Sequence, residues 1–412
     1  MEIKDLKLNP HLLKALDELG FISPTHIQEK CIPEILQGKD VFGHSSTGSG
    51  KTAAFGLPIL ENIHSGSGLK ALILTPTREL CVQVTEALRS FAKHTHIKIN
   101  SVYGGVGIEP QIHAIKSADI VVGTPGRILD HIERKTIILS KIKFLVLDEA
   151  DKMFEMGFVD SVEQIIGYTP KERQTLLFSA TVPPSVHKLV KKHLKSPIII
   201  KSQIHIDKSL LKQLYYVIKS YEKFSLLIHL LRKNPNGLAL IFCATRRETD
   251  IVARNLLNNG IQAMPIHGGL TQNRRLHAID SIKSRKVNVL VATDVAARGL
   301  DIKNISHVYN YDVPKTPDEY IHRIGRTARA GENGDAVTLL CEQDYDNFNS
   351  VISDRSLDIR KEVTPSFERA IFSRFREQGR HNGNSHSYSQ HHGSQHNRGK
   401  FQHRRFNSGR VK

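Results

Sequence analysis

The sequence predicts an α/β protein built from two consecutive domains, each with a parallel β-sheet covered by helices. Short β-branched and aliphatic runs alternate with helical patterns between residues 21 and 345. The runs form two sets, at residues 71–74, 120–122, 145–147 and 176–178, and at residues 239–242, 289–291 and 308–310. Alternating strands and helices form parallel sheets with helices on both faces. The break at residues 196–207, which contains Pro197, therefore separates the two domains.

The bulk composition is that of a globular protein. A chain of 412 residues can bury a core in two or three domains. There is no long uncharged apolar run, and the first residues lack a signal-peptide pattern, so we expect neither secretion nor a membrane span. The four cysteines lie far apart without a CxxC pair, which predicts neither a structural metal nor a disulfide framework and suits a cytoplasmic location.

The net charge of +17 predicts a polyanionic partner. Residues 374–412 hold seven arginines and two lysines against a single glutamate. From about Gln378 the composition changes to His, Asn, Gln, Ser, Gly and Arg, which cannot bury enough apolar area to offset the entropy of ordering. We expect a disordered basic tail at residues 366–412 that tethers a polyanion. Its histidines, which include His391 and His392, have no spacing typical of a metal site.

The most specific motif is a Gly-rich turn between an apolar run at residues 41–42 and a predicted helix. The turn comprises Ser46, Thr47, Gly48, Ser49, Gly50, Lys51 and Thr52. Backbone N–H groups of such a turn, together with the helix N-terminus, bind phosphate oxygens, and the lysine adds a charge for the β- and γ-phosphates. Ser45 replaces the first glycine of the GxxxxGK[ST] pattern, but a small residue still permits the turn.

An acidic cluster follows the apolar run at residues 144–147 and comprises Asp148, Glu149 and Asp151. Alone, this cluster could be solvated surface and the Gly-rich turn could be a flexible loop. Together they predict a nucleoside triphosphate site with a metal. The Thr52 hydroxyl and the Asp148 carboxylate can hold one Mg²⁺ between them, because Mg²⁺ prefers few protein oxygens and keeps its waters.

Two residues upstream of the turn are candidates for recognising the base. Phe21 offers an aromatic face, and Gln28 offers a donor and an acceptor together, as the Hoogsteen edge of adenine requires. Alone this signal is weak, since glutamines at helix starts are ordinary.

Three predicted strands are followed by loops suited to a phosphodiester backbone. The loops contain Pro76, Thr77 and Arg78, then Gly104 and Gly105, and then Thr124, Pro125, Gly126 and Arg127. Open α/β sheets bind ligands at the carboxyl ends of their strands, where Thr hydroxyls, Gly N–H groups and arginines can contact phosphates. Each loop by itself could equally be a structural turn.

A helix is predicted to begin after Thr316, with Thr316 as N-cap, Pro317 in the first turn and Glu319 three residues after the cap. His322, Arg326 and Arg329 fall at i, i+4 and i+7, so one helical face carries all three. A solvated basic face is one interpretation. Because the second domain has no phosphate loop, the alternative is that the arginines act as arginine fingers on the nucleotide of the first domain.

At this point the chain closely resembles the DEAD-box RNA helicases, whose motifs occur in order from Phe21 to Arg329. The matching strings also include Ser179, Ala180 and Thr181; His267, Gly268, Gln272 and Arg275; and residues 292–301 with Thr293 and Asp301. The resemblance implies two tandem RecA-like domains, at residues 1–203 and 211–365, joined by a linker at residues 204–210. It also implies ATP and Mg²⁺ as cofactors and RNA as the partner.

The resemblance also implies a role for each matching residue. Phe21 and Gln28 recognise adenine, the turn and Lys51 bind phosphates, and Asp301 contacts the ribose. Thr52 and Asp148 hold Mg²⁺, and Glu149 acts on the attacking water. His322, Arg326 and Arg329 serve the transferring phosphoryl group. The strand-end loops, His267, Gly268, Gln272, Arg275 and Thr293 contact RNA. Ser179, Ala180, Thr181 and Asp151 couple the two activities.

Two positions depart from the family pattern. Ile3 stands where many members carry an aromatic residue upstream of the glutamine, so we expect weaker nucleotide binding. Ala328 replaces the commoner glycine between the two arginines, and we expect this change to be harmless.

The predicted function is ATP-dependent unwinding of short RNA duplexes or remodelling of RNA–protein complexes, largely independent of RNA sequence. One alternative is a double-stranded DNA translocase, which Gln28 and the string Asp148 to Asp151 disfavour. The other is an ATP-gated RNA clamp with slow turnover, which Glu149, Arg326 and Arg329 disfavour. By analogy with short bacterial members, ribosomal precursors or RNA-decay enzymes are the expected partners.

Overall fold

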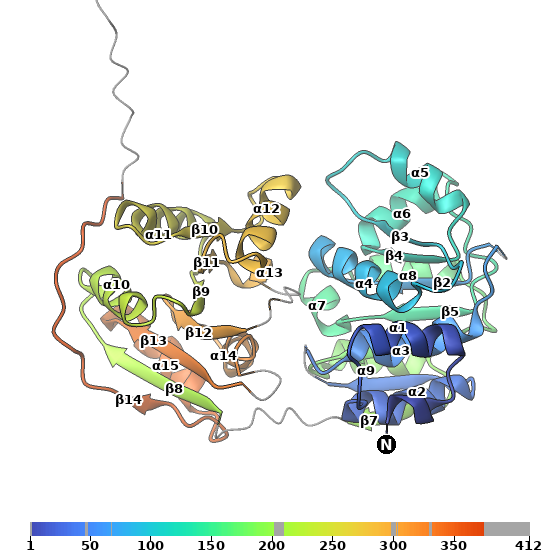
Figure 1. Cartoon of the computed structure of the whole chain (residues 1–412), viewed down its shortest axis with the longest axis horizontal. Helices are drawn as coiled ribbons and strands as arrows, with labels where there is room; N and C mark the ends of the chain where they lie inside the picture. The colour runs from blue at the N-terminus through green and yellow to red at the C-terminus, as the bar shows by residue number, and fades with distance from the viewer. Residues whose placement is uncertain are drawn as a thin grey trace, which may run out of the picture. The chain divides into compact units, whose positions relative to one another are not determined.

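The fold is taken from a computed structural model of the chain, which describes residues 2–45, 48–66, 68–201, 210–297, 302, 304–328 and 332–374. The predicted linker, apart from Leu210, and the tail beyond Arg374 lie outside these ranges. Each of the two predicted sheets is present as a seven-stranded sheet with helices on both faces (Figure 1).

The first domain is a fully parallel sheet in the order β3-β4-β2-β5-β6-β1-β7. Its strands are β1 Val41–His44, β2 Ala71–Leu74, β3 Ile99–Val102, β4 Ile120–Gly123, β5 Phe144–Leu147, β6 Gln174–Ser179 and β7 Ile198–Lys201. Its helices are η1 Ile3–Leu6, α1 Pro10–Glu18, α2 His26–Leu36, α3 Lys51–Asn62, α4 Arg78–Phe91, α5 Glu109–Lys116, α6 Pro125–Glu133, α7 Ala150–Glu155, α8 Val159–Gly167 and α9 Pro184–His193.

The second domain is also fully parallel, in the order β10-β11-β9-β12-β13-β8-β14. Its strands are β8 Leu211–Val217, β9 Leu238–Phe242, β10 Ala263–Ile266, β11 Val289–Ala292, β12 Ile305–Asn310, β13 Gly334–Leu340 and β14 Arg360–Lys361. Its helices are α10 Lys223–Lys233, α11 Arg246–Asn258, α12 Gln272–Lys283, α13 Asp294–Ala297, α14 Pro317–Ile324, η2 Glu342–Asp344 and α15 Tyr345–Ile352.

The two sheets have the same topology. Each strand of the second sheet occupies the place of the strand numbered seven lower in the first, so β8 corresponds to β1 and β12 to β5. The loops at the carboxyl ends of corresponding strands can therefore be compared one by one. These loops hold the predicted site residues.

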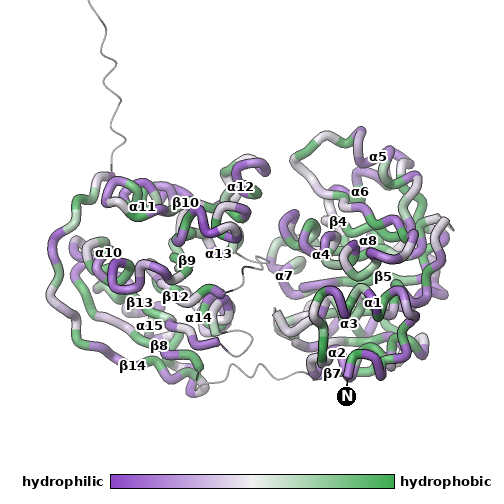
Figure 2. The backbone as a smooth tube through the Cα atoms, in the orientation of Figure 1, coloured by the Kyte–Doolittle hydropathy of each residue, from purple (hydrophilic) through white to green (hydrophobic). Residues whose placement is uncertain are grey.

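The central strands of each sheet, β2, β4 and β5 in the first and β9 and β11 in the second, are buried along their whole length and almost wholly apolar. In β5, Phe144 and Val146 pack into one core layer, while Leu145 and Leu147 pack into the layer on the opposite face. This is the alternation of side chains expected along a strand. Figure 2 shows the hydrophobic colour running through the central strands, with hydrophilic segments on the helices that cover them.

Residues 366–373, which the sequence analysis assigned to a disordered tail, lie against the second domain. Phe367 and Phe372 pack on its core, and the Phe372 ring lies 4.7 Å from that of Phe224. The Asn255 amide donates to the carbonyl of Ser373 at 2.9 Å and accepts its N–H at 2.8 Å. The domain therefore extends past residue 365, because two aromatic side chains supply apolar area that composition alone understated.

Ile3 is a core residue of the first domain. Its side chain is buried in the layer that also holds α1 to α4, and its N–H donates to the carbonyl of Ile22 at 3.2 Å. The side chain at this departure therefore belongs to the core of the first domain, and weaker nucleotide binding stays a prediction.

None of the described helices is long and apolar enough to cross a membrane. All four cysteines are buried and free.

Candidate nucleotide and RNA site

The Gly-rich turn joins β1 to α3, as predicted. Gly48 and Gly50 have φ of 84° and 92°, which is the left-handed region that glycine adopts without strain. Lys51 is the first residue of α3, and its Nζ donates to the carbonyl of Ser45 at 3.2 Å. Ser46 and Thr47 lie outside the described residues. The described part of the turn has the geometry of a phosphate loop.

The Gln28 amide connects the predicted adenine site to this turn. Its Oε1 accepts from the N–H of Thr25 at 2.9 Å, and its Nε2 donates to the carbonyl of Gly50 at 3.1 Å. An amide offers two donor hydrogens and two acceptor lone pairs, so one of each remains for a base. Phe21 is half-buried and packs edge-on against Phe91, with ring centroids 5.7 Å apart.

Asp148 and Glu149 follow β5 and are both almost fully buried. Burial raises the pKa of Asp148, and it outweighs the opposing effect of the Lys51 charge, while the negative charge of Glu149 adds a smaller contribution in the same direction as burial. Burial alone would also raise the pKa of Glu149, but Lys152, Lys51 and Arg326 lower it below its usual value. Cations thus favour the ionised form of Glu149.

A metal at Asp148 fits the donor set. Among the described residues, Asp148 Oδ1 is buried without a hydrogen-bond partner, which is costly unless a cation or water binds it. Thr52 is the second residue of α3, directly after Lys51, and is half-buried. A carboxylate and a hydroxyl at this place are ligands suited to Mg²⁺.

The third carboxylate of the cluster, Asp151, joins α7 to the end of β6. Its Oδ2 accepts from both the N–H and the hydroxyl of Thr181, at 2.8 and 2.9 Å. Its own N–H donates to Ser179 Oγ at 3.2 Å, and Ser179 Oγ donates to the carbonyl of Thr181 at 2.7 Å. The carbonyl of Ala180 lies 2.9 Å from His44 Nε2 of β1. The predicted coupling residues therefore form one hydrogen-bonded unit.

The prediction that one helical face carries His322, Arg326 and Arg329 is wrong beyond His322. Thr316 caps the helix as predicted, because its hydroxyl accepts from the N–H of Glu319 at 3.2 Å. The helix ends at Ile324, with Gly325 as its C-cap, and Arg326 lies in the following turn, 3% exposed. The glycine is a helix stop signal that outweighs the basic periodicity. Arg329 and Asp301 lie outside the described residues.

Ala328 has φ of 52°, in the left-handed region. A residue with a Cβ pays roughly 1 kcal/mol there, and glycine does not. The exchange of glycine for alanine, expected to be harmless, therefore carries a conformational cost beside Arg326.

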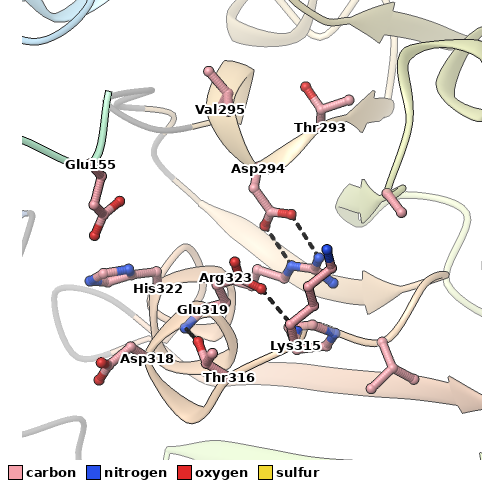
Figure 3. Close-up of a pocket in the computed structure, with 13 residues that line it drawn as sticks. Glu155, Thr293, Asp294, Val295, Lys315, Thr316, Asp318, Glu319, His322 and Arg323 are labelled. Atoms are coloured by element: carbon pink, nitrogen blue, oxygen red, sulfur yellow. Dashed lines mark hydrogen bonds and ion pairs between the residues drawn. The ribbon is translucent and has the colours of Figure 1, made fainter. Parts of the chain in front are cut away.

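A cavity of about 520 Å³ lies beside α14. Figure 3 shows Glu155 of α7 and His322 of α14 among the residues that line it. Arg323 forms a bidentate pair with Asp294, with Nε–Oδ1 of 2.6 Å and Nη2–Oδ2 of 2.8 Å (Figure 3). Because Asp294 directly follows Thr293, this pair ties the predicted RNA contact at Thr293 to the helix that carries His322.

The predicted RNA loops of the first domain meet at Arg78, the first residue of α4. Gly105 has φ of 83°, and a Cβ at this position would collide with the Arg78 guanidinium. Both terminal nitrogens of Arg127 donate to the carbonyl of Val106 at 3.2 Å. The two arginines thus hold the Gly-Gly loop from both sides.

The remaining residues of these loops sit at helix starts. Thr77 is the N-cap of α4, and its hydroxyl accepts from the N–H of Leu80 at 3.3 Å, while Pro76 is buried just before it. Thr124 is the N-cap of α6, Pro125 its first residue, and Gly126 is exposed with open space around it. Backbone N–H groups at such helix starts can bind phosphate.

In the second domain, His267 has both ring nitrogens engaged. Nε2 lies 3.0 Å from Asp250 Oδ1, and Nδ1 accepts the N–H of Gly269 at 3.1 Å. The imidazole therefore shapes the loop that presents Gly268. The guanidinium of Arg246, the first residue of α11, packs against Gly268.

Gln272 and Arg275 are engaged by Glu79 of the first domain. Gln272 Nε2 donates to Glu79 Oε1 at 3.0 Å, and Arg275 Nη2 pairs with Glu79 Oε2 at 2.8 Å. Direct contact of these two side chains with RNA stays a prediction. The structure gives them a role between the domains that sequence reasoning did not identify.

Sequence reasoning also missed Arg246, Arg323 and Asp294. The signal for Arg246 was an internal repeat. Thr-Arg at positions 77–78 is followed by Gly-Gly at 104–105, and Thr-Arg at 245–246 is followed by Gly-Gly at 268–269. Arg323 and Asp294 had no comparable signal, because 29 residues separate them.

Comparisons with known proteins agree with this geometry. Residues 25–189 match the DEAD/DEAH box helicase family, and residues 222–331 match the helicase conserved C-terminal domain. The chain is 44% identical over 354 residues to the ATP-dependent RNA helicase CshA of Limosilactobacillus reuteri, covering 85% of this chain and 71% of that protein. It is 46% identical over 342 residues to CshA of Listeria monocytogenes, covering 82% of this chain and 66% of that protein.

The fold is similar to that of Saccharomyces cerevisiae Dbp5 bound to RNA and ADP BeF3. The two chains are 32% identical, with a TM-score of 0.79, and the match covers 88% of this chain and 96% of Dbp5. Both domains, the order of the motifs and the level of identity thus lead to one conclusion. The chain belongs to the DEAD-box family of ATP-dependent RNA helicases.

Proposed function

We propose that this helicase hydrolyses ATP at the carboxyl end of β5 and uses the cycle to separate or remodel short RNA duplexes. The observation that carries the proposal is the buried charge set at this place. Lys51, Asp148 and Glu149 are each at most 6% exposed, and Arg326 of the second domain acts electrostatically on Glu149. Buried charges without full pairing are costly to the fold, and such clusters are enriched at functional sites.

ATP is bound mainly by the first domain. The turn N–H groups of Ser46, Thr47, Gly48, Ser49 and Gly50, with Lys51, bind the phosphates. Gln28 and Phe21 recognise adenine. The hydrogen bond from the Gln28 amide to the Gly50 carbonyl supports placing the base site next to the phosphate site. Through this bond, the conformation of the Gly-rich turn depends on Gln28.

Mg²⁺ is held by Thr52 and Asp148, and when bound it neutralises charge on the phosphates. Glu149 orients the attacking water and accepts its proton, which the lowered pKa of its carboxylate permits at neutral pH. Arg326 and Arg329 stabilise charge on the transferring phosphoryl group. His322 links this region to the unit formed by Ser179, Ala180 and Thr181, and Asp301 contacts the ribose.

RNA is bound along its backbone by both domains. The first domain contributes the loops held by Arg78 and Arg127, and the second contributes Gly268 and Thr293. These groups are arginines, hydroxyls and backbone N–H groups, which contact phosphates without reading bases. Binding is therefore largely independent of sequence.

Glu149→Gln tests the catalytic assignment. The amide keeps the shape of the side chain but cannot accept a proton, so RNA-stimulated phosphate release should fall at least about a hundredfold. ATP binding, measured by a fluorescent analogue, should stay within about threefold, because the mutated side chain contributes to catalysis rather than to affinity.

Glu133→Gln, on an exposed residue at the end of α6, is the matched control and should change neither quantity. Phosphate release at the wild-type rate in Glu149→Gln would refute the role given to Glu149.

The physiological substrate is proposed to be a ribosomal precursor or an RNA handled by decay enzymes in the cytoplasm. Sequencing of RNA crosslinked to the Glu149→Gln protein with ATP present tests this, because complexes that cannot hydrolyse ATP should accumulate on true targets. A uniform spread of crosslinks over the transcriptome would argue against both classes. The part of the tail beyond Arg374, which lies outside the described residues, stays a predicted RNA tether.

A further inference from the structure

Lys152 is a buried lysine directly beside the proposed catalytic carboxylate. It is the third residue of α7, and its side chain is 1% exposed. Its Nζ lies 3.5 Å from Glu149 Oε2, whose side chain is 2% exposed. Within the described ranges, both carboxylate oxygens of Glu149 are buried without a hydrogen-bond partner. The same holds for the Lys152 ammonium group. Lys152 is therefore the cation that acts most strongly on the Glu149 carboxylate, and Lys51 and Arg326 act on it more weakly.

The backbone fixes this pair. Glu149 has φ of 53° and ψ of 51°, an unusual conformation for a residue with a Cβ, and it is the N-cap of α7. The Lys152 N–H donates to the Glu149 carbonyl at 3.0 Å and to Asp151 Oδ1 at 3.1 Å. This turn thus places the Lys152 side chain beside the Glu149 carboxylate.

A carboxylate buried without hydrogen bonds is not held by its own side-chain torsions. Rotation about them would take it toward water, where it gains hydration. A fixed cation opposes that rotation, because the attraction between two buried charges is much stronger than in solvent. A general base needs this restraint, since a misplacement of about 1 Å can reduce a rate about a hundredfold.

We infer that Lys152 is a positioning residue for ATP hydrolysis, which holds the Glu149 carboxylate in place for the attacking water. The inference rests on the proposed role of Glu149 and extends it, because it gives a function to a residue outside the matched motifs. Lys152 acts through Glu149 and does not itself contact the nucleotide. Replacement of Lys152 should therefore lower turnover without changing the affinity for ATP.

The test compares Lys152→Met and Lys152→Arg in the full-length protein. Methionine has a similar volume and removes the charge, and replacing a buried charge by an apolar group of similar size is often tolerated by the fold. For Lys152→Met we expect kcat of the RNA-stimulated reaction to fall about tenfold or more, with KM for ATP within about twofold. Arginine restores a cation, so Lys152→Arg should recover kcat to within about threefold of the wild type.

A purely structural lysine would give a different pattern. Thermal unfolding identifies any loss of folded protein, and Lys188→Met on the exposed face of α9 controls for removal of a lysine from the first domain. A folded Lys152→Met protein with unchanged kcat would overturn the inference, as would a rise in KM at constant kcat. If Lys152→Met does not fold, Lys152→Arg decides alone: kcat near wild type supports the inference, and a tenfold loss overturns it.

The double variant with Glu149→Gln separates this inference from the proposed function. If Lys152 acts through Glu149, adding Lys152→Met to Glu149→Gln should reduce turnover no further, because coupled residues are not additive. A further tenfold loss in the double variant would overturn the inference alone. Full turnover in Glu149→Gln would instead refute the proposed function, irrespective of Lys152.

Discussion

The two domains share one topology but differ at the junction where the first domain is proposed to bind phosphate. In the first domain this junction joins β1 to α3, and in the second it joins β8 to α10. A buried lysine is the first residue of the helix in both, Lys51 in α3 and Lys223 in α10. The first loop has Gly48 and Gly50, whereas residues 218–222 of the second contain no glycine.

The two lysines have different partners. Lys51 Nζ donates to the backbone carbonyl of Ser45 at 3.2 Å, and its charge acts on the buried Asp148. Lys223 Nζ pairs with Asp312 at 3.2 Å and Asp344 at 3.5 Å, and it lies 4.8 Å from the centre of the Tyr311 ring. The same position in one fold is thus a proposed ligand site in the first domain, whereas in the second domain it carries a buried ion-pair cluster.

The opposite situation holds on the side predicted to contact RNA, where the domains match. Thr77 and Thr245 each cap a helix through their hydroxyl, and an arginine follows each cap. Each of these arginines, Arg78 and Arg246, packs against a Gly-Gly loop at the end of the corresponding strand. A long RNA backbone offers similar phosphates to both domains, whereas one nucleotide needs only a single phosphate loop.

Replacing Lys51 or Lys223 by methionine gives the largest expected contrast between the two domains. Lys51→Met should reduce ATP turnover about a thousandfold with little loss of stability, since it removes a charge that serves the phosphates. Lys223→Met should instead lower the free energy of unfolding by about 3 kcal/mol, because it leaves two partly buried carboxylates without their cation. Denaturant unfolding and turnover per folded molecule measure both effects. Loss of turnover in a stably folded Lys223→Met protein would break the comparison.

The Lys223 cluster also predicts a direction with pH. Burial alone would lower the pKa of Lys223, but Asp312, Cys341 and Asp344 raise it above the ordinary value. A cation with a raised folded pKa contributes stability that is fully present below the unfolded pKa and lost as pH rises through the folded pKa. The stability difference between wild type and Lys223→Met should therefore be constant at neutral pH and shrink only in strongly alkaline solution.

Removal of either repeated arginine sharpens the comparison on the RNA side. Arg78→Ala and Arg246→Ala should each weaken binding of single-stranded RNA about tenfold, and each lost phosphate contact should reduce the log-log salt slope by about 0.7. The exposed Arg134 of the first domain is the control, and its replacement by alanine should change neither quantity. A large effect for Arg78 with none for Arg246 would show that the repeated geometry does not imply a repeated function.

The smallest expected effect concerns Ala328, which lies between Arg326 and Arg329 in the sequence of the second domain. Ala328→Gly removes the cost of the left-handed conformation, but glycine gains entropy in the unfolded chain, so the net stabilisation should be below about 1 kcal/mol. Thermal unfolding of the two proteins measures it. A loss of stability would mean that the methyl group of Ala328, which packs beside Leu211 and Ile324, contributes more than the strain costs.

Much of the first nucleotide-binding half could be predicted because its parts are contiguous. The turn that ends in Lys51 and Thr52 and the cluster that begins with Asp148 each follow one strand directly, so local sequence specifies them. Local periodicity failed at α14, where it placed Arg326 on a helical face although Gly325 ends the helix. Composition similarly failed at residues 366–373, because burial of a few aromatic residues depends on what they pack against.

The amino-acid sequence by itself determined the fold class, the phosphate loop, the acidic cluster and the family, since each rests on short patterns within one strand–turn–helix unit. Only the tertiary structure decided the partners of groups that are distant in the chain. Glu79 meets Gln272 across 193 positions, and Lys223 meets Asp344 across 121. Hydrogen bonds and ion pairs depend on distances of a few ångströms in space, which the folding of the sheets sets and the spacing along the chain does not.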